Sequence, residues 1–233
     1  MDRDVPLIIP AGWTFAVWGP IFLLCAVYTV YQALPSERYN PLLRRIGWPL
    51  GLAFVRNGLW TTVQPLQNPI LSQVIVTLIL ASSLVALIRF ARFGKTSRGV
   101  RWIVGLPVGL LASWLTAANV VGFNDMLVRR EVVGSGFPAA LTGASLLIVR
   151  TVVAAAVLGA IAGGSLQATA TYTLGVSWGL FGIVANQYDT SLITSGGALL
   201  CLVALVARLV WAVGKTRPGS SGSIGNSGSA RVA

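Results

Sequence analysis

The sequence contains no histidine and has only six acidic residues in 233. Without histidine the chain lacks the usual general base, the usual haem ligand and the commonest zinc ligand. Its two cysteines, Cys25 and Cys201, lie in separate apolar stretches and have no Cys-x-x-Cys spacing. We therefore expect no metal site, no disulfide framework and no required cofactor, and an enzyme is not the first expectation.

Charged residues are also scarce, at 10% of the chain, whereas hydrophobic residues make up 55% and the mean hydropathy is +0.77. These values lie outside the range of soluble domains. The net charge of +11 does not indicate nucleic-acid binding, because the basic residues lie in short segments between apolar runs. The composition therefore predicts an integral membrane protein whose main partner is the lipid bilayer.

Seven apolar stretches are each long enough to cross a bilayer as a helix. They cover roughly residues 11–33, 46–65, 70–91, 102–122, 137–162, 167–186 and 191–213. Short connections between them imply antiparallel neighbours. We expect an all-α bundle of about seven transmembrane helices within residues 1–213, followed by a disordered cytoplasmic tail over 214–233.

The basic residues are distributed unequally between the two ends of these stretches. One side would carry Arg3, Arg129 and Arg130, and the other Arg38, Arg44, Arg45, Arg89, Arg92, Lys95, Arg98, Arg101, Arg208, Lys215, Arg217 and Arg231. The positive-inside rule then places the N-terminus outside and the C-terminus in the cytoplasm.

Two arginines, Arg56 and Arg150, lie in the middle of predicted spans instead. Each is about 15 Å from the nearer cytoplasmic end, and exposure to lipid at such depth costs at least about 2.5–3.5 kcal/mol. Both side chains should therefore face protein or a wet cavity, although no acidic residue lies mid-span to pair with them. Two interpretations stay open: satisfaction by backbone carbonyls, water and amides such as Asn119, or a pocket that receives an anion.

Several tryptophans also lie well inside the predicted spans, near two asparagines. Aromatic faces with a few convergent polar groups are typical of pockets for planar apolar ligands, although buried tryptophans equally form plain core. This group contains Trp18, Trp60, Trp114 and Trp178, with Asn57 and Asn119 nearby.

Three motifs on three successive spans resemble the TspO/MBR family, the tryptophan-rich sensory proteins related to the mitochondrial translocator protein. They are Pro10-Ala11-Gly12-Trp13 continuing to Val17-Trp18-Gly19-Pro20, then Asn57-Gly58-Leu59-Trp60-Thr61, and Pro107 followed by Ser113-Trp114 and Ala118-Asn119. The similarity covers residues 7–124, and 137–213 would be the additional helices of a longer bacterial subgroup. Longer members also begin with a helix ahead of the Pro-Ala-Gly motif, so whether such a helix belongs to this chain stays open. The resemblance to a bacterial subgroup implies a bacterial inner membrane as the location.

The resemblance implies a bundle that binds a tetrapyrrole such as a porphyrin, or a sterol-like ligand, in a sensory or transport role. By position it implies a ligand site of Trp18, Asn57, Trp60, Trp114, Ala118 and Asn119. The mid-span position of Arg56 and Arg150 makes them further candidates, as partners for the propionates of a planar anionic ligand, since a guanidinium matches a carboxylate.

Two other functions stay open. The first is a small secondary transporter of an organic anion, in which the arginines would form the anion path; no convincing internal repeat supports it. The second is a membrane enzyme, which the missing histidines make less favourable. Assembly as a homodimer also stays open.

Overall fold

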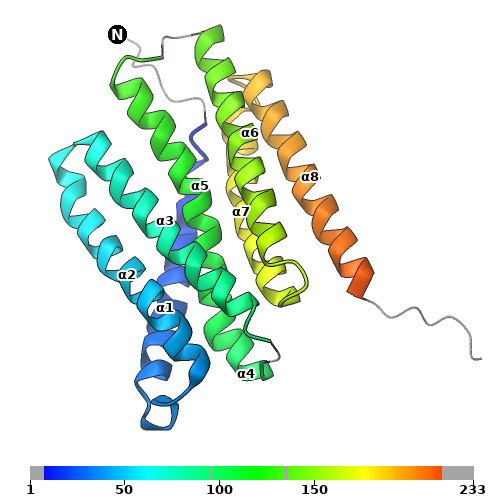
Figure 1. Cartoon of the computed structure of the whole chain (residues 1–233). Coiled ribbons are helices and arrows are strands. Elements are labelled where there is room, and N and C mark those ends of the chain that lie inside the picture. Colours follow the sequence, from blue (N-terminus) through cyan, green and yellow to red (C-terminus); the bar gives the residue numbers. More distant parts are fainter. Residues whose placement is uncertain (1–7, 95, 134–135, 217–233) are drawn as a thin grey trace, which may run out of the picture.

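A computed structural model describes residues 8–94, 96–133 and 136–216 of the chain. Within these residues the structure is helical and contains no strand. Its long helices lie side by side (Figure 1) and are α1 (Trp18–Ala33), α2 (Pro41–Val63), α3 (Pro69–Ala91), α5 (Leu106–Arg129), α6 (Phe137–Ala160), α7 (Leu166–Gln187) and α8 (Leu192–Thr216). The predicted all-α membrane bundle is confirmed.

Among the described residues, 6 helical segments are long and apolar enough to span a membrane. The remaining long helix, α2, has 23 residues but carries Arg44, Arg45 and Arg56, which lower its hydropathy. It packs along α3, and α3 in turn packs on α5. Since α2 is as long as its neighbours and antiparallel to α3, we regard it as the remaining span.

Local sequence signals explain where several helices begin. The Asn40 side chain accepts hydrogen bonds from the backbone N–H groups of Leu42 and Leu43, at 3.0 and 3.4 Å, and Pro41 occupies the first helical position. Asn68 and Pro69 repeat this arrangement at the start of α3, where Asn68 accepts from Leu71 N–H at 3.0 Å. Asparagine caps and first-turn prolines are favoured at these positions because the first N–H groups of a helix have no internal partner.

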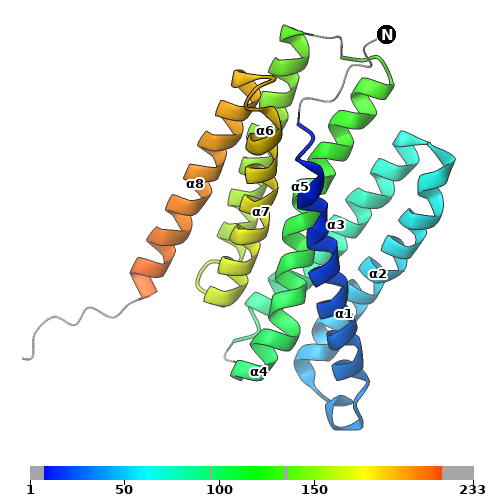
Figure 2. The same cartoon turned by 180° about the vertical axis from the view of Figure 1, so that it is seen from behind.

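The N-terminal segment, residues 8–17, lies against α7 before α1 begins, as Figure 2 shows from behind, and its Phe15 ring contacts Trp114 of α5. Ala11 N–H donates to the Gly182 carbonyl at 2.9 Å, and the Asn186 side chain donates to the Ile9 carbonyl at 3.0 Å. The Trp178 indole donates to the Thr14 carbonyl at 3.1 Å. These contacts hold the 3₁₀ helix η1 (Gly12–Val17) and so position the side chains that follow it.

Helix α5 occupies the middle of the bundle and contacts α1, α3, α6 and α7 (Figure 1). Glycines allow the backbones of α5 and α7 to approach closely: a Cβ atom at Gly175 would lie 1.9 Å from Ser113 Oγ, and one at Gly109 would lie 2.1 Å from Thr171 Oγ1. Glycines at these positions therefore serve helix packing.

The ends of three helices differ from the predicted boundaries. α2 begins at Pro41 rather than 46, because Asn40 caps it, and α5 continues to Arg129 rather than ending at 122. α8 runs to Thr216, so the first residues of the predicted disordered tail are helical; the rest of that tail lies outside the described residues. A π-helical turn, η4 (Arg101–Gly105), joins the short α4 (Arg98–Val100) to α5.

Candidate ligand cavity

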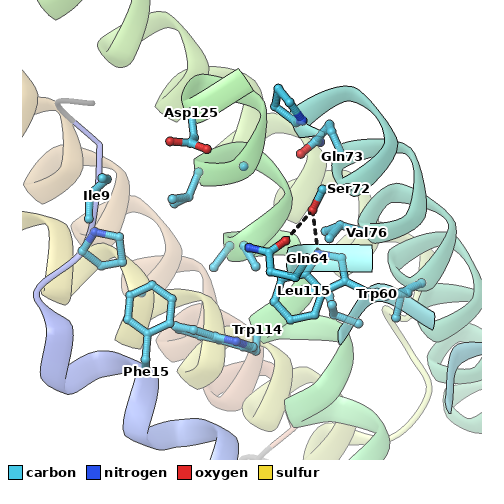
Figure 3. A pocket seen from close by; sticks show the side chains of 18 of the residues that line it. Ile9, Phe15, Trp60, Gln64, Ser72, Gln73, Val76, Trp114, Leu115 and Asp125 are labelled. Carbon is cyan, nitrogen blue, oxygen red and sulfur yellow. Dashed lines mark hydrogen bonds between the residues drawn. The ribbon is translucent and has the colours of Figure 1, made fainter. Parts of the chain in front are cut away.

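A cavity of about 460 Å³ lies within the bundle, walled by the N-terminal segment, α1, α2, α3 and α5, with α6 and α7 behind (Figure 3). Residues at the ends of helices form one side, including Gln64, Asn68, Asp125 and Arg129. The opposite side is formed by residues from the middle of their helices. Figure 3 shows Asp125 and Trp114 at opposite ends of the part of α5 that faces the cavity.

Most of the ligand-site residues predicted from the sequence line this one cavity. They are Trp18, Asn57, Trp60, Trp114, Ala118 and Arg150. Arg56 and Asn119 are not among its lining residues. That any of the eight binds a ligand stays a prediction, but the structure brings six of them together from α1, α2, α5 and α6.

An aromatic cluster forms the inner wall. The Phe15 ring meets Trp114 edge to face, with centroids 5.5 Å apart and planes at 88°. Trp18 meets Trp114 in the same manner at 6.2 Å and 83°. Trp114 is only 2% exposed, whereas Phe15 is 43% exposed. The wall therefore joins a buried indole to a ring near the surface, and edge-to-face packing fixes their orientation.

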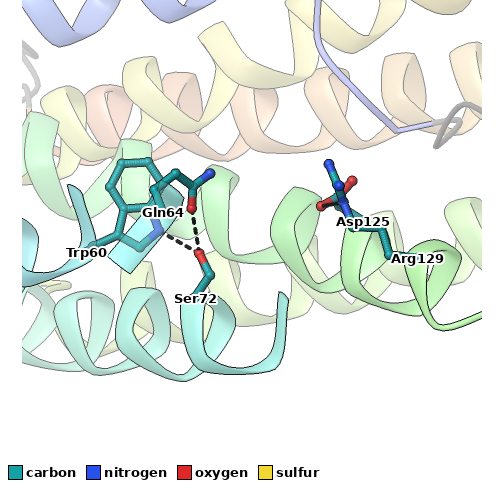
Figure 4. Close-up of polar contacts among 5 residues, drawn as sticks. All are labelled: Trp60, Gln64, Ser72, Asp125 and Arg129. Atoms are coloured by element: carbon teal, nitrogen blue, oxygen red, sulfur yellow. Dashed lines mark hydrogen bonds and ion pairs between the residues drawn. The ribbon is translucent and has the colours of Figure 1, made fainter. Parts of the chain in front are cut away.

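A chain of hydrogen bonds forms the opposite wall (Figures 3 and 4). The Trp60 indole donates to Ser72 Oγ at 2.9 Å, and Ser72 Oγ donates to Gln64 Oε1 at 2.9 Å. These bonds join the end of α2 and the 3₁₀ turn η3 (Gln64–Leu66) to the start of α3. Trp60 therefore presents its ring to the cavity while its N–H is already satisfied.

An ion pair on α5 lies at the helix-end side of the cavity (Figure 4). Arg129 Nε donates to Asp125 Oδ2 at 2.7 Å, and the side chains are 59% and 35% exposed. The pair joins residues four apart on one helix, so the two charges largely offset each other locally. Neither residue was predicted to lie at the site, because the predicted span ended at 122.

Arg150 lies at the buried side of the cavity, between α6 and α7. It is 1% exposed, and its Nη2 donates to the Val176 carbonyl at 2.8 Å. Within the described residues, Arg150 Nε and Nη1 have no hydrogen-bond partner. A Cβ atom at Gly179, which also lines the cavity, would lie 2.8 Å from Arg150 Nη2. Because Gly179 has no side chain, the Arg150 guanidinium fits beside α7.

Arg56 and Asn119 have other surroundings. Arg56 Nη1 donates to Ser82 Oγ and to the Leu78 carbonyl, the latter at 3.3 Å, so it is bound to α3. Asn119 Nδ2 donates to Thr77 Oγ1 at 2.8 Å, also on α3. Both arginines contact protein, which confirms that part of the sequence analysis. The partners of Arg56 are a backbone carbonyl and a hydroxyl. This agrees with the first of the two interpretations, in which protein groups satisfy the arginine.

Sequence reasoning did not assign several cavity residues to the site. Phe15 stands in the first motif, and only its aromatic character signalled a role. Gln64, Ser72 and Gln73 are polar residues at the ends of apolar stretches, where polarity is expected for solvation alone. Gly179 follows Gly175 by four residues, a spacing typical of helix packing alone. Its place beside Arg150 depends on the rotation of α7, which the sequence does not specify.

The fold and this cavity define a helical membrane protein with an internal ligand-sized pocket. The chain matches the sequence model of the family described as TSPO-like protein over residues 1–212. It therefore belongs to that family, and the match includes the additional helices after residue 137 as well as the three motifs. Comparisons with curated proteins and with solved structures give no significant match.

Proposed function

We propose that the protein binds a hydrophobic planar ligand, tetrapyrrole-like or sterol-like, within this cavity and acts in its sensing or transport. The observation that carries the proposal is the aromatic wall of Phe15, Trp18 and Trp114, which faces polar groups across the cavity. Mostly apolar pockets of roughly 300–1,000 Å³ with a few polar groups are typical ligand sites. Family membership supports a membrane-embedded binding or sensory protein.

The residues present favour a porphyrin without a strong protein ligand to a central metal. The chain has no histidine, and Cys25 and Cys201 do not line the cavity. Binding would instead rest on contact between the planar ring and the aromatic wall. Arg150 lines the cavity and Arg56 does not, which supports Arg150 as the partner of an anionic group of the ligand.

A spectral titration of the purified chain with protoporphyrin tests this proposal. The parent protein should shift the porphyrin absorption band saturably. Trp114→Ala should weaken binding by about 1.5–3 kcal/mol, or about 10- to 150-fold, because it removes a buried aromatic face. Trp48→Ala is the matched control, since Trp48 is 81% exposed and does not line the cavity. Equal affinity of the two variants would contradict the proposed site.

The alternative function is a small secondary transporter of an organic anion. It is supported by two arginines at different depths of one cavity, Arg129 near the surface and Arg150 buried. Reconstituted protein would then carry a fluorescent organic anion across liposomes, and Arg150→Gln would abolish the flux. Saturable porphyrin binding without any anion flux would favour the first proposal.

A further inference from the structure

Resting on the proposed function of this cavity, we propose that its ligand is an acid with a single carboxylate, which binds at Arg150 and Trp114. The ligand's apolar body would lie along the aromatic wall. Its neutral end would lie among the amides at the helix-end side, such as Gln64 and Asn68. The site would thus select acids over their esters.

The charged residues that line the cavity indicate a ligand with one anionic group. The charged residues that line the cavity are Asp125, Arg129 and Arg150. Asp125 and Arg129 pair with each other at 2.7 Å, and the described residues provide no carboxylate partner for Arg150. The cavity therefore has one uncompensated charge, which is positive and buried. A buried charge is stable only with a partner, so an anionic group is the complementary ligand feature.

Three buried N–H donors of Arg150 and Trp114 also lack acceptors. Arg150 Nε and Nη1 and the Trp114 indole Nε1 have no hydrogen-bond partner within the described chain. Buried donors are usually satisfied, and arginine provides donors that suit a carboxylate. Trp114 is 2% and Arg150 1% exposed, so these donors are shielded from bulk solvent. A carboxylate is a small group that accepts hydrogen bonds from such donors.

Arg150 lies close to α5 at the place where α5 packs on α7. A Cβ atom at Gly179 would lie 2.8 Å from Arg150 Nη2 and 3.0 Å from the Cβ of Ala117. Ala117 is three residues from Trp114, so both lie on the same face of α5. Arg150 therefore lies beside Ala117, and Trp114, Ala117 and Arg150 all line the cavity.

A second carboxylate on the same edge of the ligand would have no unpaired cationic partner. It would be buried beside a guanidinium that the first one already neutralises, and burial of an unpaired charge is costly. A second carboxylate turned toward the helix-end side would meet the Asp125–Arg129 pair, in which the two charges already offset each other. The cavity therefore favours a monoacid over a diacid of equal size.

The experiment compares protoporphyrin, its monomethyl ester and its dimethyl ester, which carry two, one and no carboxylates on one ring system. Affinities are measured with the purified full chain in detergent micelles. We expect the monoester to bind about 10- to 100-fold more tightly than the diester, as for a charge-assisted hydrogen bond, and at least as tightly as the diacid. In Arg150→Gln the monoester and diester should bind equally. Arg56→Gln is the matched control and should retain the preference, because Arg56 contacts α3 outside the cavity.

Gly179→Ala provides a second variant that retains the arginine. Its methyl group would crowd Nη2, so the preference for the monoester should fall, whereas Gly47→Ala, with open space at its Cβ, should keep it. Equal binding of all three porphyrins to the parent protein would overturn the monoacid inference and leave the proposed function standing. A preference for the monoester that survives both Arg150→Gln and Gly179→Ala would likewise overturn the monoacid inference and leave the proposed function standing.

Pyrenebutyric acid and its methyl ester separate the inference from the tetrapyrrole proposal. They offer a planar body with one carboxylate or none. Preference for the acid that depends on Arg150, together with no porphyrin binding, would support the monoacid site and reject a tetrapyrrole as ligand. Binding of neither the porphyrins nor the pyrene acid would reject both.

Discussion

At the scale of single residues, two arginines with the same sequence setting have different environments. Arg56 donates to Ser82 and to the Leu78 carbonyl, whereas Arg150 donates to one carbonyl and is otherwise unpaired within the described residues. A buried charge with few partners carries a desolvation penalty that its contacts do not offset. We infer that Arg150 is retained for binding rather than for stability.

This difference predicts opposite stability effects of one substitution. Arg150→Met should leave unchanged or raise the free energy of unfolding of the ligand-free protein, by up to about 4 kcal/mol, because an apolar side chain of similar length replaces a poorly paired charge. Arg56→Met should lower it by about 1–3 kcal/mol, because hydrogen bonds from a charged donor to α3 are lost. Thermal unfolding in detergent measures both; destabilisation by Arg150→Met equal to that of Arg56→Met would mean that Arg150 chiefly fastens α6 to α7.

The sequence could predict that both arginines face protein, because depth and the cost of lipid exposure decide it. It could not predict which one lines the cavity. That depends on the rotation of α2 and α6 about their axes, and both helices are apolar on several faces. Trp114 was easier to place, because the motif that contains it implied a position inside the bundle, and Trp114 is buried in α5.

At the scale of helices, the contact between α5 and α7 holds the inner wall of the cavity in place. Gly175→Ala should lower the unfolding temperature, because its methyl group would lie 1.9 Å from Ser113 Oγ and 2.7 Å from Ser113 Cβ. Adding Ser113→Gly should restore much of the loss. Gly51→Ala is the control: its Cβ would meet nothing within 4 Å, and alanine is favoured in a helix by about 1 kcal/mol. Equal effects of Gly175→Ala and Gly51→Ala would contradict the close approach of α5 and α7.

Hydropathy predicted the position of every long helix but not the helix ends that line the cavity. The predicted span at 102–122 omitted Asp125 and Arg129, because charged residues lower the hydropathy of a window although α5 continues through them. The path of the N-terminal segment along α7 was also not predictable, since it depends on contacts between residues far apart, such as Asn186 with Ile9.

At the scale of the whole molecule, the distribution of basic residues predicts the orientation in the membrane. The connection between α3 and α4 and the end of α8 should be cytoplasmic, because most arginines and lysines lie there. Fluorescent-protein fusions after Lys215 should therefore fluoresce, and alkaline phosphatase fusions at the same site should be inactive. The reverse pattern would mean that the cavity side formed by Asp125 and Asn68 faces the cytoplasm.

Photolabelling tests the central claim, that a planar ligand binds in the internal cavity, most directly. A diazirine derivative of protoporphyrin is activated in membranes that contain the full chain, and the labelled peptides are identified by mass spectrometry. We expect labels on the segments that carry Phe15, Trp18 and Trp114, and unlabelled porphyrin should compete for them. Labels confined to exposed side chains on the outside of the bundle, such as Ile148 or Leu200, would show lipid-facing adsorption and contradict the account.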